Sequence, residues 1–333
     1  MLLTTDVPTA DERQRVLAEL PWLPDFMQLW RFVSEVFDHT NISVLDATIP
    51  YGHARGAIVA LSEGVDTMLD ATYGLADSCA LMSLLDRDEV PRPTMREPLS
   101  AAGADSKTPR SLCLRLARSS LENSAVRVAS AADHLANAHV RLAWELNAAT
   151  SPEVEEFFDP RKQNPGRWLS AKELADKLVE LDIGEGARLP FFTSNEAFRA
   201  YYSNPDAARM RRFRDGVVHR ERPTYRELPS LGRETQWRDG SIRLGFVPDP
   251  KAPNFDQRQA EVSGALRALL PWAQSLWDTA VSWLQTMQVG VVEEDGQLDL
   301  HIVMELGSQP VRDKRDPAPY LLDRAPFARP GRT

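Results

Sequence analysis

One histidine lies among four arginines in residues 211–220, RRFRDGVVHR, although the net charge of the chain is −9. The order is Arg214-Asp215, then three residues, then His219. A histidine that titrates near neutral pH can take a proton from a ribose 2′-hydroxyl or give one to the 5′ leaving oxygen. An arginine fork matches the charge that develops on the phosphorane oxygens. These residue types suit RNA cleavage by transesterification, a reaction that needs no divalent metal.

The spacing within this motif assigns a role to Asp215 and raises a geometric difficulty. Asp215 precedes His219 by four residues, so on a helix its carboxylate can reach the ring, hold one tautomer and stabilise the imidazolium. Arg214 and His219 are five residues apart, about 140° around an ideal helix. The two side chains converge on one phosphate only if the helix is distorted near Asp215-Gly216, or if a second copy of the motif meets the first across a dimer.

The charge around the motif is opposite to that of the whole chain. Residues 209–226 hold seven arginines against Asp215 and Glu221, a local charge of +5. Such a patch can bind an anionic ligand even though the protein is acidic overall. The residues expected to contact RNA phosphates are Arg211, Arg212, Arg220 and Arg222. The competing interpretation is a solvated amphipathic helix that buries Met210, Phe213 and Val217 and exposes its arginines.

An arginine followed directly by Asn, Asp or His, with a histidine at this spacing, is expected about 0.1 times by chance in a chain of this composition. The stretch FRDGVVHRE resembles the motif of HEPN domains, and Arg214, Asp215 and His219 match it residue by residue. The resemblance implies a bundle of helices and a metal-independent endoribonuclease that acts as a homodimer, often as a toxin or defence effector. It also implies an antitoxin or sensor protein as partner. Some members carry a modified Tyr two residues after the His; Glu221 stands there, so that form of control is not expected.

Three residues of the long helical segment at 110–148 are auxiliary candidates for the site: Glu122, Asp133 and His134. HEPN enzymes often use a further polar residue from a neighbouring helix, and the sequence does not choose among the three. A structural role is the alternative for His134. His134 and His139 are five residues apart, which is not a metal-ligand spacing on a helix. We expect no metal and no cofactor.

Hydrophobic periodicity predicts a mainly α protein with two small β-hairpins. Helices are expected at residues 11–20, 25–38, 53–86, 110–148, 168–182 and 194–202, in the segment that starts at Ser203-Asn204-Pro205-Asp206, and at 257–287. The helix at 53–86 is expected to break near Gly74, and Pro271 to kink or split the last one. The hairpins are expected at 232–247, around Asp239-Gly240, and at 288–306, around Asp295-Gly296.

The proline-rich stretch at 90–110 predicts a boundary between an N-terminal helical region, 1–108, and a HEPN-like helical domain with two hairpins, 109–307. A Pro-rich tail, 308–333, follows. Cys79 and Cys113 lie on apolar segments outside any Cys cluster, which predicts two buried free thiols. With no signal peptide and no run of about 18 apolar residues, we expect a cytoplasmic protein that does not enter the membrane.

Three classes of function remain open at this stage. The first is a HEPN-type endoribonuclease. The second is a non-catalytic HEPN-like scaffold that binds RNA, a nucleotide or a protein. The third is a helical protein with no nucleic-acid role, in which the motif is a coincidence. Exposure of the motif separates the third class from the others, and a cleavage assay separates the first from the second.

Overall fold

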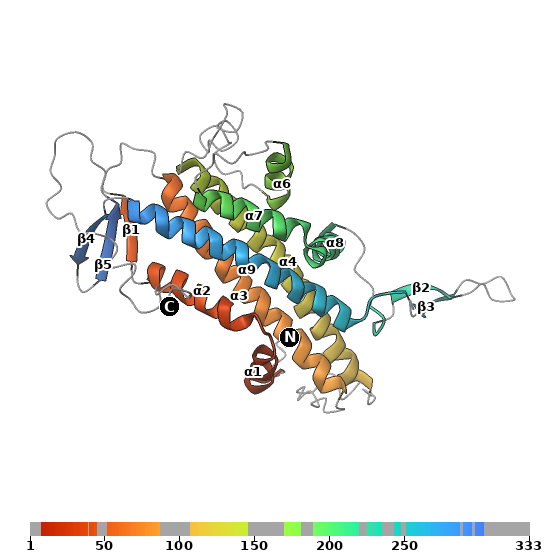
Figure 1. Ribbon diagram of the computed structural model, residues 1–333. Coiled ribbons are helices and arrows are strands. Elements are labelled where there is room, and N and C mark those ends of the chain that lie inside the picture. Colours follow the sequence, from red (N-terminus) through yellow and green to blue (C-terminus); the bar gives the residue numbers. More distant parts are fainter. Residues whose placement is uncertain are drawn as a thin grey trace, which may run out of the picture. The chain divides into compact units, whose positions relative to one another are not determined.

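The computed structural model describes residues 8–38, 40–44, 52–86, 107–145, 170–180, 189–219, 225–228, 230–234, 243–247, 251–286, 289–294 and 297–302. The described part is mainly helical, which confirms the predicted class (Figure 1). The helices are α1 (Ala10–Ala18), α2 (Leu23–Asp38), α3 (Gly52–Asp86), α4 (Lys107–Glu145), α6 (Ala171–Glu180), α7 (Leu189–Ser203), α8 (Pro205–His219) and α9 (Phe255–Thr286). The strands are β1 (Thr40–Val44), β2 (Ser230–Glu234), β3 (Arg243–Val247), β4 (Val289–Glu294) and β5 (Gln297–Ile302).

The chain folds into two compact units, each assembled from three separated segments. The first unit comprises Met1–Leu23, Asp70–Ala129 and Asn204–Leu266, and the second comprises Pro24–Leu69, Ser130–Ser203 and Arg267–Thr333. Helix α8, which carries the motif, therefore belongs to the first unit. The proline-rich stretch between α3 and α4 and the C-terminal tail lie outside the described residues.

Two helix starts form as their local sequences predict. At α6, the Ser170 hydroxyl accepts from the backbone N–H of Glu173 at 3.2 Å, and the Glu173 carboxylate accepts from the backbone N–H of Ser170 at 2.9 Å. At α8, the side-chain oxygen of Asn204 accepts from the backbone N–H groups of residues 206 and 207 at 2.9 and 3.2 Å. Pro205 takes the first helical position, where its missing N–H costs nothing. The start of the motif helix is thus set by its own sequence.

Helix α3 is not broken at Gly74, and the expectation of a break there is wrong. The glycine instead allows α4 to approach closely within the first unit. The hydroxyl of Ser124 on α4 donates to the carbonyl of Ala71 at 2.6 Å. A Cβ at position 74 would lie 3.2 Å from the backbone oxygen of Ser120. Since that neighbour is backbone, it cannot move aside easily, so a small residue is needed for packing.

Helix α9 is likewise not split at Pro271, which lies inside the 32-residue helix on its exposed side. Proline removes one backbone hydrogen bond, but the well-packed apolar residues on the other side hold the helix together. Helix α7 begins at Leu189, five residues before the start expected from Ser194. Ser194 therefore lies inside the helix, where it is buried and its hydroxyl lies 3.0 Å from that of Thr279 on α9.

The strands pair in two small sheets. Strand β2 pairs antiparallel with β3, and β4 with β5. The turns expected at Asp239-Gly240 and Asp295-Gly296 lie outside the described residues. Strand β1, which periodicity does not predict, pairs in parallel with β5, with Thr40 opposite Leu298. Because that pairing joins segments far apart in the sequence, no local pattern predicts it.

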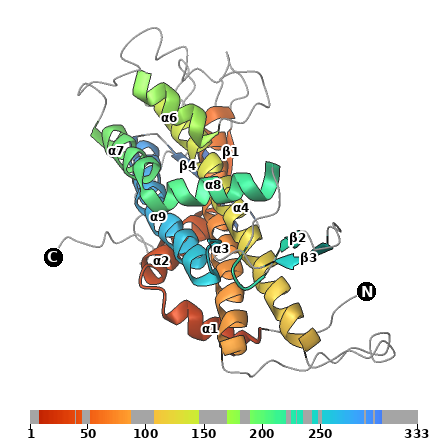
Figure 2. The ribbon, with the colours of Figure 1, turned by 90° about the vertical axis from the view of Figure 1, so that its right-hand side faces the viewer.

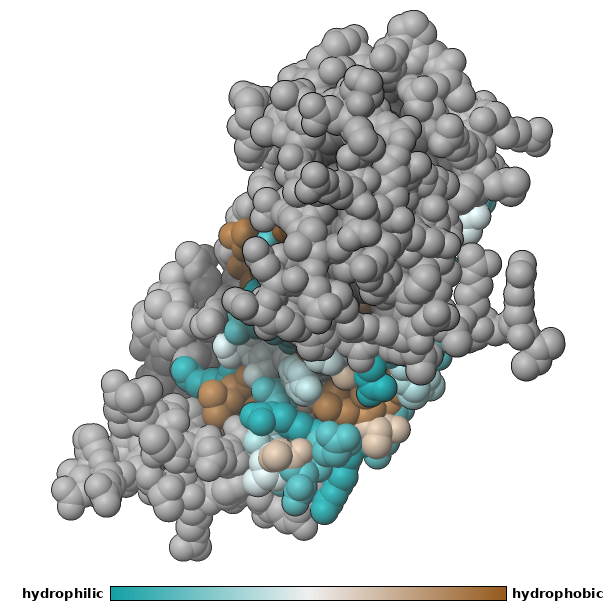
Figure 3. Space-filling model, turned by 90° about the vertical axis from the view of Figure 1, so that its left-hand side faces the viewer, coloured by the Kyte–Doolittle hydropathy of each residue, from teal (hydrophilic) through white to brown (hydrophobic). Residues whose placement is uncertain are grey.

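Among the described helices, none has an apolar stretch long enough to cross a membrane. On the face shown in Figure 3, the coloured residues form small hydrophobic groups with hydrophilic ones between them. This mixed pattern is ordinary for a protein surface.

A buried histidine organises the core of the second unit. The indole N–H of Trp272 donates to Nδ1 of His139 at 3.1 Å, so Nε2 carries the proton and donates to Oδ1 of Asn195, 2.8 Å away. The rings of Phe198 and Tyr201 pack around Trp272. Burial lowers the pKa of His139 from 6.5 to about 4, against the opposing effect of the Asn195 hydrogen bond. The ring is therefore neutral at physiological pH, and its two nitrogens are both satisfied.

This histidine makes stability depend on pH. Because the pKa of His139 is about 4 in the folded state and 6.5 is its ordinary value, protonation favours the unfolded chain. The free energy of unfolding is therefore highest above pH 6.5 and falls as the pH drops toward 4, by about 3 kcal/mol from this group. We expect His139→Gln to be less stable at neutral pH but to lose less stability between pH 6.5 and 5. Chemical denaturation of both proteins across that window measures the difference, and parallel curves would contradict the assignment.

Candidate functional site

Helix α8 separates its residues into a buried and an exposed side. Ala207, Met210 and Phe213 are buried, and Arg212 and Asp215 are exposed. The buried side matches two of the three residues predicted for it; Val217, the third, is half-buried. In both ribbon views α8 lies across α9 rather than along it (Figures 1 and 2). The motif is thus carried by a helix whose other side is packed into the first unit.

Arg214 and Asp215 form an ion pair on this helix. Nη1 of Arg214 donates to Oδ1 of Asp215 at 3.0 Å, and the two side chains are 31% and 53% exposed. Nε of the same guanidinium group is buried and has no hydrogen-bond partner among the described residues. The pair is therefore accessible to a ligand from one side.

Helix α8 is continuous through Asp215 and Gly216 and ends at His219. The described helix has no break where a distortion would be needed, so positions 214 and 219 remain about 140° apart around its axis. Of the arginines expected to contact RNA, Arg211 is half-buried and Arg212 is exposed. Arg220 and Arg222 lie outside the described residues.

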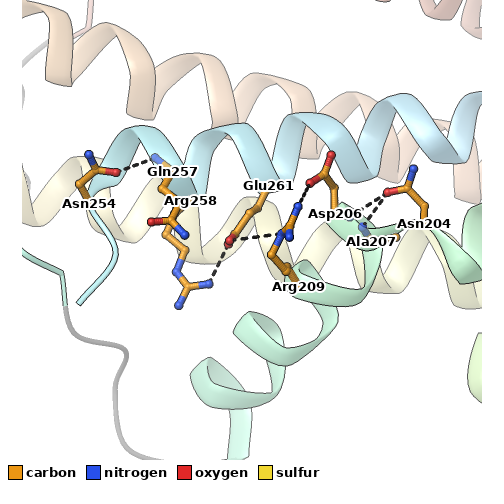
Figure 4. A network of polar contacts seen from close by, with 8 residues as sticks. All are labelled: Asn204, Asp206, Ala207, Arg209, Asn254, Gln257, Arg258 and Glu261. Carbon is orange, nitrogen blue, oxygen red and sulfur yellow. Dashed lines mark hydrogen bonds and ion pairs between the residues drawn. The ribbon is translucent and has the colours of Figure 1, made fainter. Parts of the chain in front are cut away.

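A polar network joins the first half of α8 to α9 (Figure 4). Arg209 donates through Nη2 to Asp206, one turn earlier on α8, at 2.8 Å, and its Nε lies 3.8 Å from Glu261 of α9. The other oxygen of Glu261 accepts from Nη1 of Arg258 at 2.7 Å. Glu261 is only 5% exposed. One buried carboxylate is therefore shared by an arginine from each helix.

Three aromatic rings and two guanidinium groups continue this contact toward the motif. Tyr225 stacks on Phe255 with centroids 4.6 Å apart, and its edge meets Phe213 of α8 at 6.3 Å. The guanidinium of Arg258 lies 4.6 Å from the centre of the Phe213 ring, and that of Arg118 lies 5.6 Å from the Tyr225 ring. Such stacking stabilises a desolvated cation. Phe213, which directly precedes Arg214, is thus in contact with both the ring of Tyr225 and the guanidinium of Arg258.

The three auxiliary candidates have different surroundings. Glu122 of α4 is buried in the first unit, where its carboxylate accepts from Nε of Arg118 at 2.6 Å. Through Arg118 and Tyr225 it is linked to the aromatic contact beneath α8. Asp133 lies in the second unit, where its carboxylate accepts from the backbone N–H of Ala171 at the start of α6, at 2.8 Å.

His134 also lies in the second unit, with Nδ1 3.2 Å from a carboxylate oxygen of Glu63. The structure thus shows Glu122 in the same unit as the motif, and gives Asp133 a helix-capping contact and His134 an ion-pair geometry. Sequence patterns did not single out Arg258, Glu261 or Tyr225. The pair Arg258 and Glu261 has an ordinary i, i+3 helix spacing, and nothing local distinguishes it from a surface ion pair.

Among the described residues, the cysteines and the potential metal ligands form neither a reactive thiol nor a metal site. Both cysteines are free; Cys113 is buried, as predicted, and Cys79 is half-buried. Burial, then the charges of Asp256 and Glu19, raises the pKa of Cys79 to about 12, and burial also raises the pKa of Cys113. Protonated thiols are poor nucleophiles and ligands. Within the described ranges, no group of three or more His, Cys, Asp or Glu side chains is placed to hold a metal ion.

A function for this chain has to be assigned from its own residues and structure. No protein-family model matches the chain, and neither does any curated protein or solved structure.

Proposed function

We propose that the protein is a metal-independent endoribonuclease of HEPN type, with Arg214, Asp215 and His219 as its catalytic residues. The observation that carries the proposal is the partly exposed Arg214–Asp215 pair on a continuous helix that ends at His219. The exposed position favours a ligand-binding role over a purely packing role. The resemblance of the motif to HEPN domains and the mainly helical fold agree with it.

In the proposed reaction, His219 takes the proton of a ribose 2′-hydroxyl, whose oxygen then attacks the adjacent phosphorus. The bond to the 5′ oxygen breaks, and the imidazolium form of His219 returns its proton to that oxygen. Arg214 stabilises the negative charge on the phosphorane oxygens. Asp215 stabilises the imidazolium form of His219. The products are a 2′,3′-cyclic phosphate and a 5′-hydroxyl end.

The proposal includes a homodimer. Positions 214 and 219 are about 140° apart on α8, so one chain does not direct both at one phosphate. Two motifs related by a two-fold axis supply an arginine from one copy and a histidine from the other. Each dimer then holds two such composite sites, and one histidine in each serves first as base and then as acid.

The proposed substrate is RNA, held by the basic face of α8. Arg212 is exposed, Arg211 is half-buried, and the segment that continues to Arg220 and Arg222 adds further positive charge. In a chain of net charge −9, such a local patch is the part that attracts phosphates. A role as a toxin or defence effector, with an antitoxin or sensor partner, belongs to the same proposal.

The second candidate function is a non-catalytic scaffold that binds RNA, a nucleotide or a partner protein. One observation favours it: Arg214 is already engaged by Asp215, which neutralises part of its charge. In that case the basic helix retains affinity for phosphate groups, but no proton transfer takes place.

The test of the proposed function is incubation of the full chain with a mixed RNA pool in the presence of EDTA. We expect cleavage that EDTA does not reduce, with products that carry 2′,3′-cyclic phosphate ends. A scaffold would bind the same RNA, with an affinity that falls steeply with salt, and leave it intact. If the protein neither cleaves RNA nor binds it in a salt-dependent way, the basic helix is only a solvated face.

A further inference from the structure

Helix α8 approaches α9 unusually closely at one point. A Cβ added to Gly264 of α9 would lie 2.8 Å from the Cβ of Asp206 and closer still to its carboxylate. The absence of a side chain at position 264 therefore allows the first turn of α8 to rest on α9. This contact sets the distance between the helices at one end but leaves the rotation of α8 about its own axis to other contacts.

Glu261, one turn before Gly264, provides those contacts. One carboxylate oxygen of Glu261 lies 3.8 Å from Nε of Arg209 on α8, and the other accepts from Nη1 of Arg258 on α9 at 2.7 Å. Arg258, held in this way, stacks on Phe213 at 4.6 Å. Residues 209 and 213 are four apart and share one side of α8. One carboxylate thus acts on two successive turns of the helix, the second of which directly precedes Arg214.

We infer that Glu261 is a positioning residue that fixes the rotation of α8, and with it the direction of Arg214; its catalytic consequence rests on the proposed function. Glu261 is only 5% exposed, and its carboxylate lies between two guanidinium groups, which it holds through its negative charge. Without that charge Arg209 and Arg258 lose their common partner, and Arg258 is free to leave the ring of Phe213. The helix then loses its defined orientation, and its backbone hydrogen bonds open more often because fewer contacts hold it against α9.

Glu261→Gln and Glu261→Asp distinguish charge from packing. Gln keeps the size of Glu and removes the charge, whereas Asp keeps the charge and removes one methylene. A positioning role that depends on charge predicts that the Asp variant is closer to wild type, and a packing role predicts that the Gln variant is. Asp278→Asn is the matched control, because it removes one negative charge from an exposed position of the same helix.

Amide hydrogen exchange tests the orientation of α8 without any assay of activity. In Glu261→Gln we expect exchange in residues 205–219 to rise about tenfold, the change expected for loss of a hydrogen bond to a charged group. Exchange in α6 and α7 should not change, and in Asp278→Asn exchange of α8 should match wild type. Arg209→Gln starts from an exposed side chain, 45% accessible, and removes the longer ion pair of Glu261 together with the contact to Asp206. It leaves the pair with Arg258 in place, so it should raise exchange of α8 by a smaller factor, and it can be measured even if Glu261→Gln fails to fold.

Cleavage kinetics test the consequence for the motif. In Glu261→Gln we expect kcat to fall about tenfold while KM for RNA stays constant or decreases, because removal of a negative charge near the basic helix favours RNA binding. Glu261→Asp should recover part of kcat. If the wild-type chain cleaves no RNA, the proposed function fails, and the exchange experiment still decides whether Glu261 orients α8.

Three results would overturn the inference. The first is exchange of α8 in both Glu261→Gln and Arg209→Gln that equals that of Asp278→Asn. The second is a rise in exchange across both units, which indicates general destabilisation rather than release of one helix. The third is a Gln variant that cleaves like wild type while the Asp variant is impaired, which indicates packing.

Discussion

His219→Ala and Arg214→Ala are each expected to lower the rate of RNA cleavage by at least about 100-fold, the usual size of a lost proton-transfer group or oxyanion contact. The first change removes the only proposed acid or base, and the second removes the charge that stabilises the phosphorane. Rates measured with labelled RNA in EDTA, at saturating and limiting substrate, separate the loss of kcat from any change in KM.

The control for this experiment is Arg199→Ala, which removes an exposed arginine of α7 that is 3.5 Å from Glu196. It should cleave RNA like wild type. Circular dichroism and thermal unfolding should show little change in any of the three variants, because Arg214 is partly exposed and pairs with Asp215, a surface carboxylate. Full activity in either motif variant would remove that residue from the catalytic set.

Mixing the two inactive variants is expected to restore cleavage. If each site combines Arg214 of one chain with His219 of the other, a dimer of one Arg214→Ala chain and one His219→Ala chain holds one intact site and one doubly altered site. Random exchange makes half of the dimers mixed, so activity should reach about a quarter of that of wild type. The measurement is the cleavage rate of each variant alone and after co-refolding or prolonged mixing.

The control for the mixing experiment is a double variant, His219→Ala with Arg214→Ala in one chain, mixed with His219→Ala. This pair can form no intact composite site and should remain inactive. Sedimentation at the assay concentration establishes the dimer. A fully active monomer would contradict the shared site, since α8 is continuous and does not bring positions 214 and 219 together in one chain.

Local sequence is sufficient to start two of the helices and to give the helical class. Ser170 with Glu173, and Asn204 with Pro205, start α6 and α8 because a side-chain oxygen a few residues away satisfies the free backbone N–H groups. The mainly helical class follows from periodicity for the same reason: hydrogen bonds and side-chain neighbours within a helix are close in sequence. The arginine-rich motif and its placement on a helix are also local properties.

Only the tertiary structure decides the features that depend on distant segments. Gly74 and Pro271 look like helix breakers locally, yet close packing against α4 and the buried side of α9 keep both helices continuous. Strand β1 exists because β5, far along the chain, offers a parallel partner.

The same limit applies to the candidate site. The sequence by itself determined that Arg214, Asp215 and His219 share one helix, because the start signal at Asn204-Pro205 lies just before them and no further proline follows until after His219. Only the tertiary structure decided which way that helix faces, because its orientation depends on Gly264 and on the buried charge of Glu261. An i, i+3 pair such as Arg258 and Glu261 is indistinguishable in sequence from a solvated one, and burial against another helix is what turns it into a defined contact.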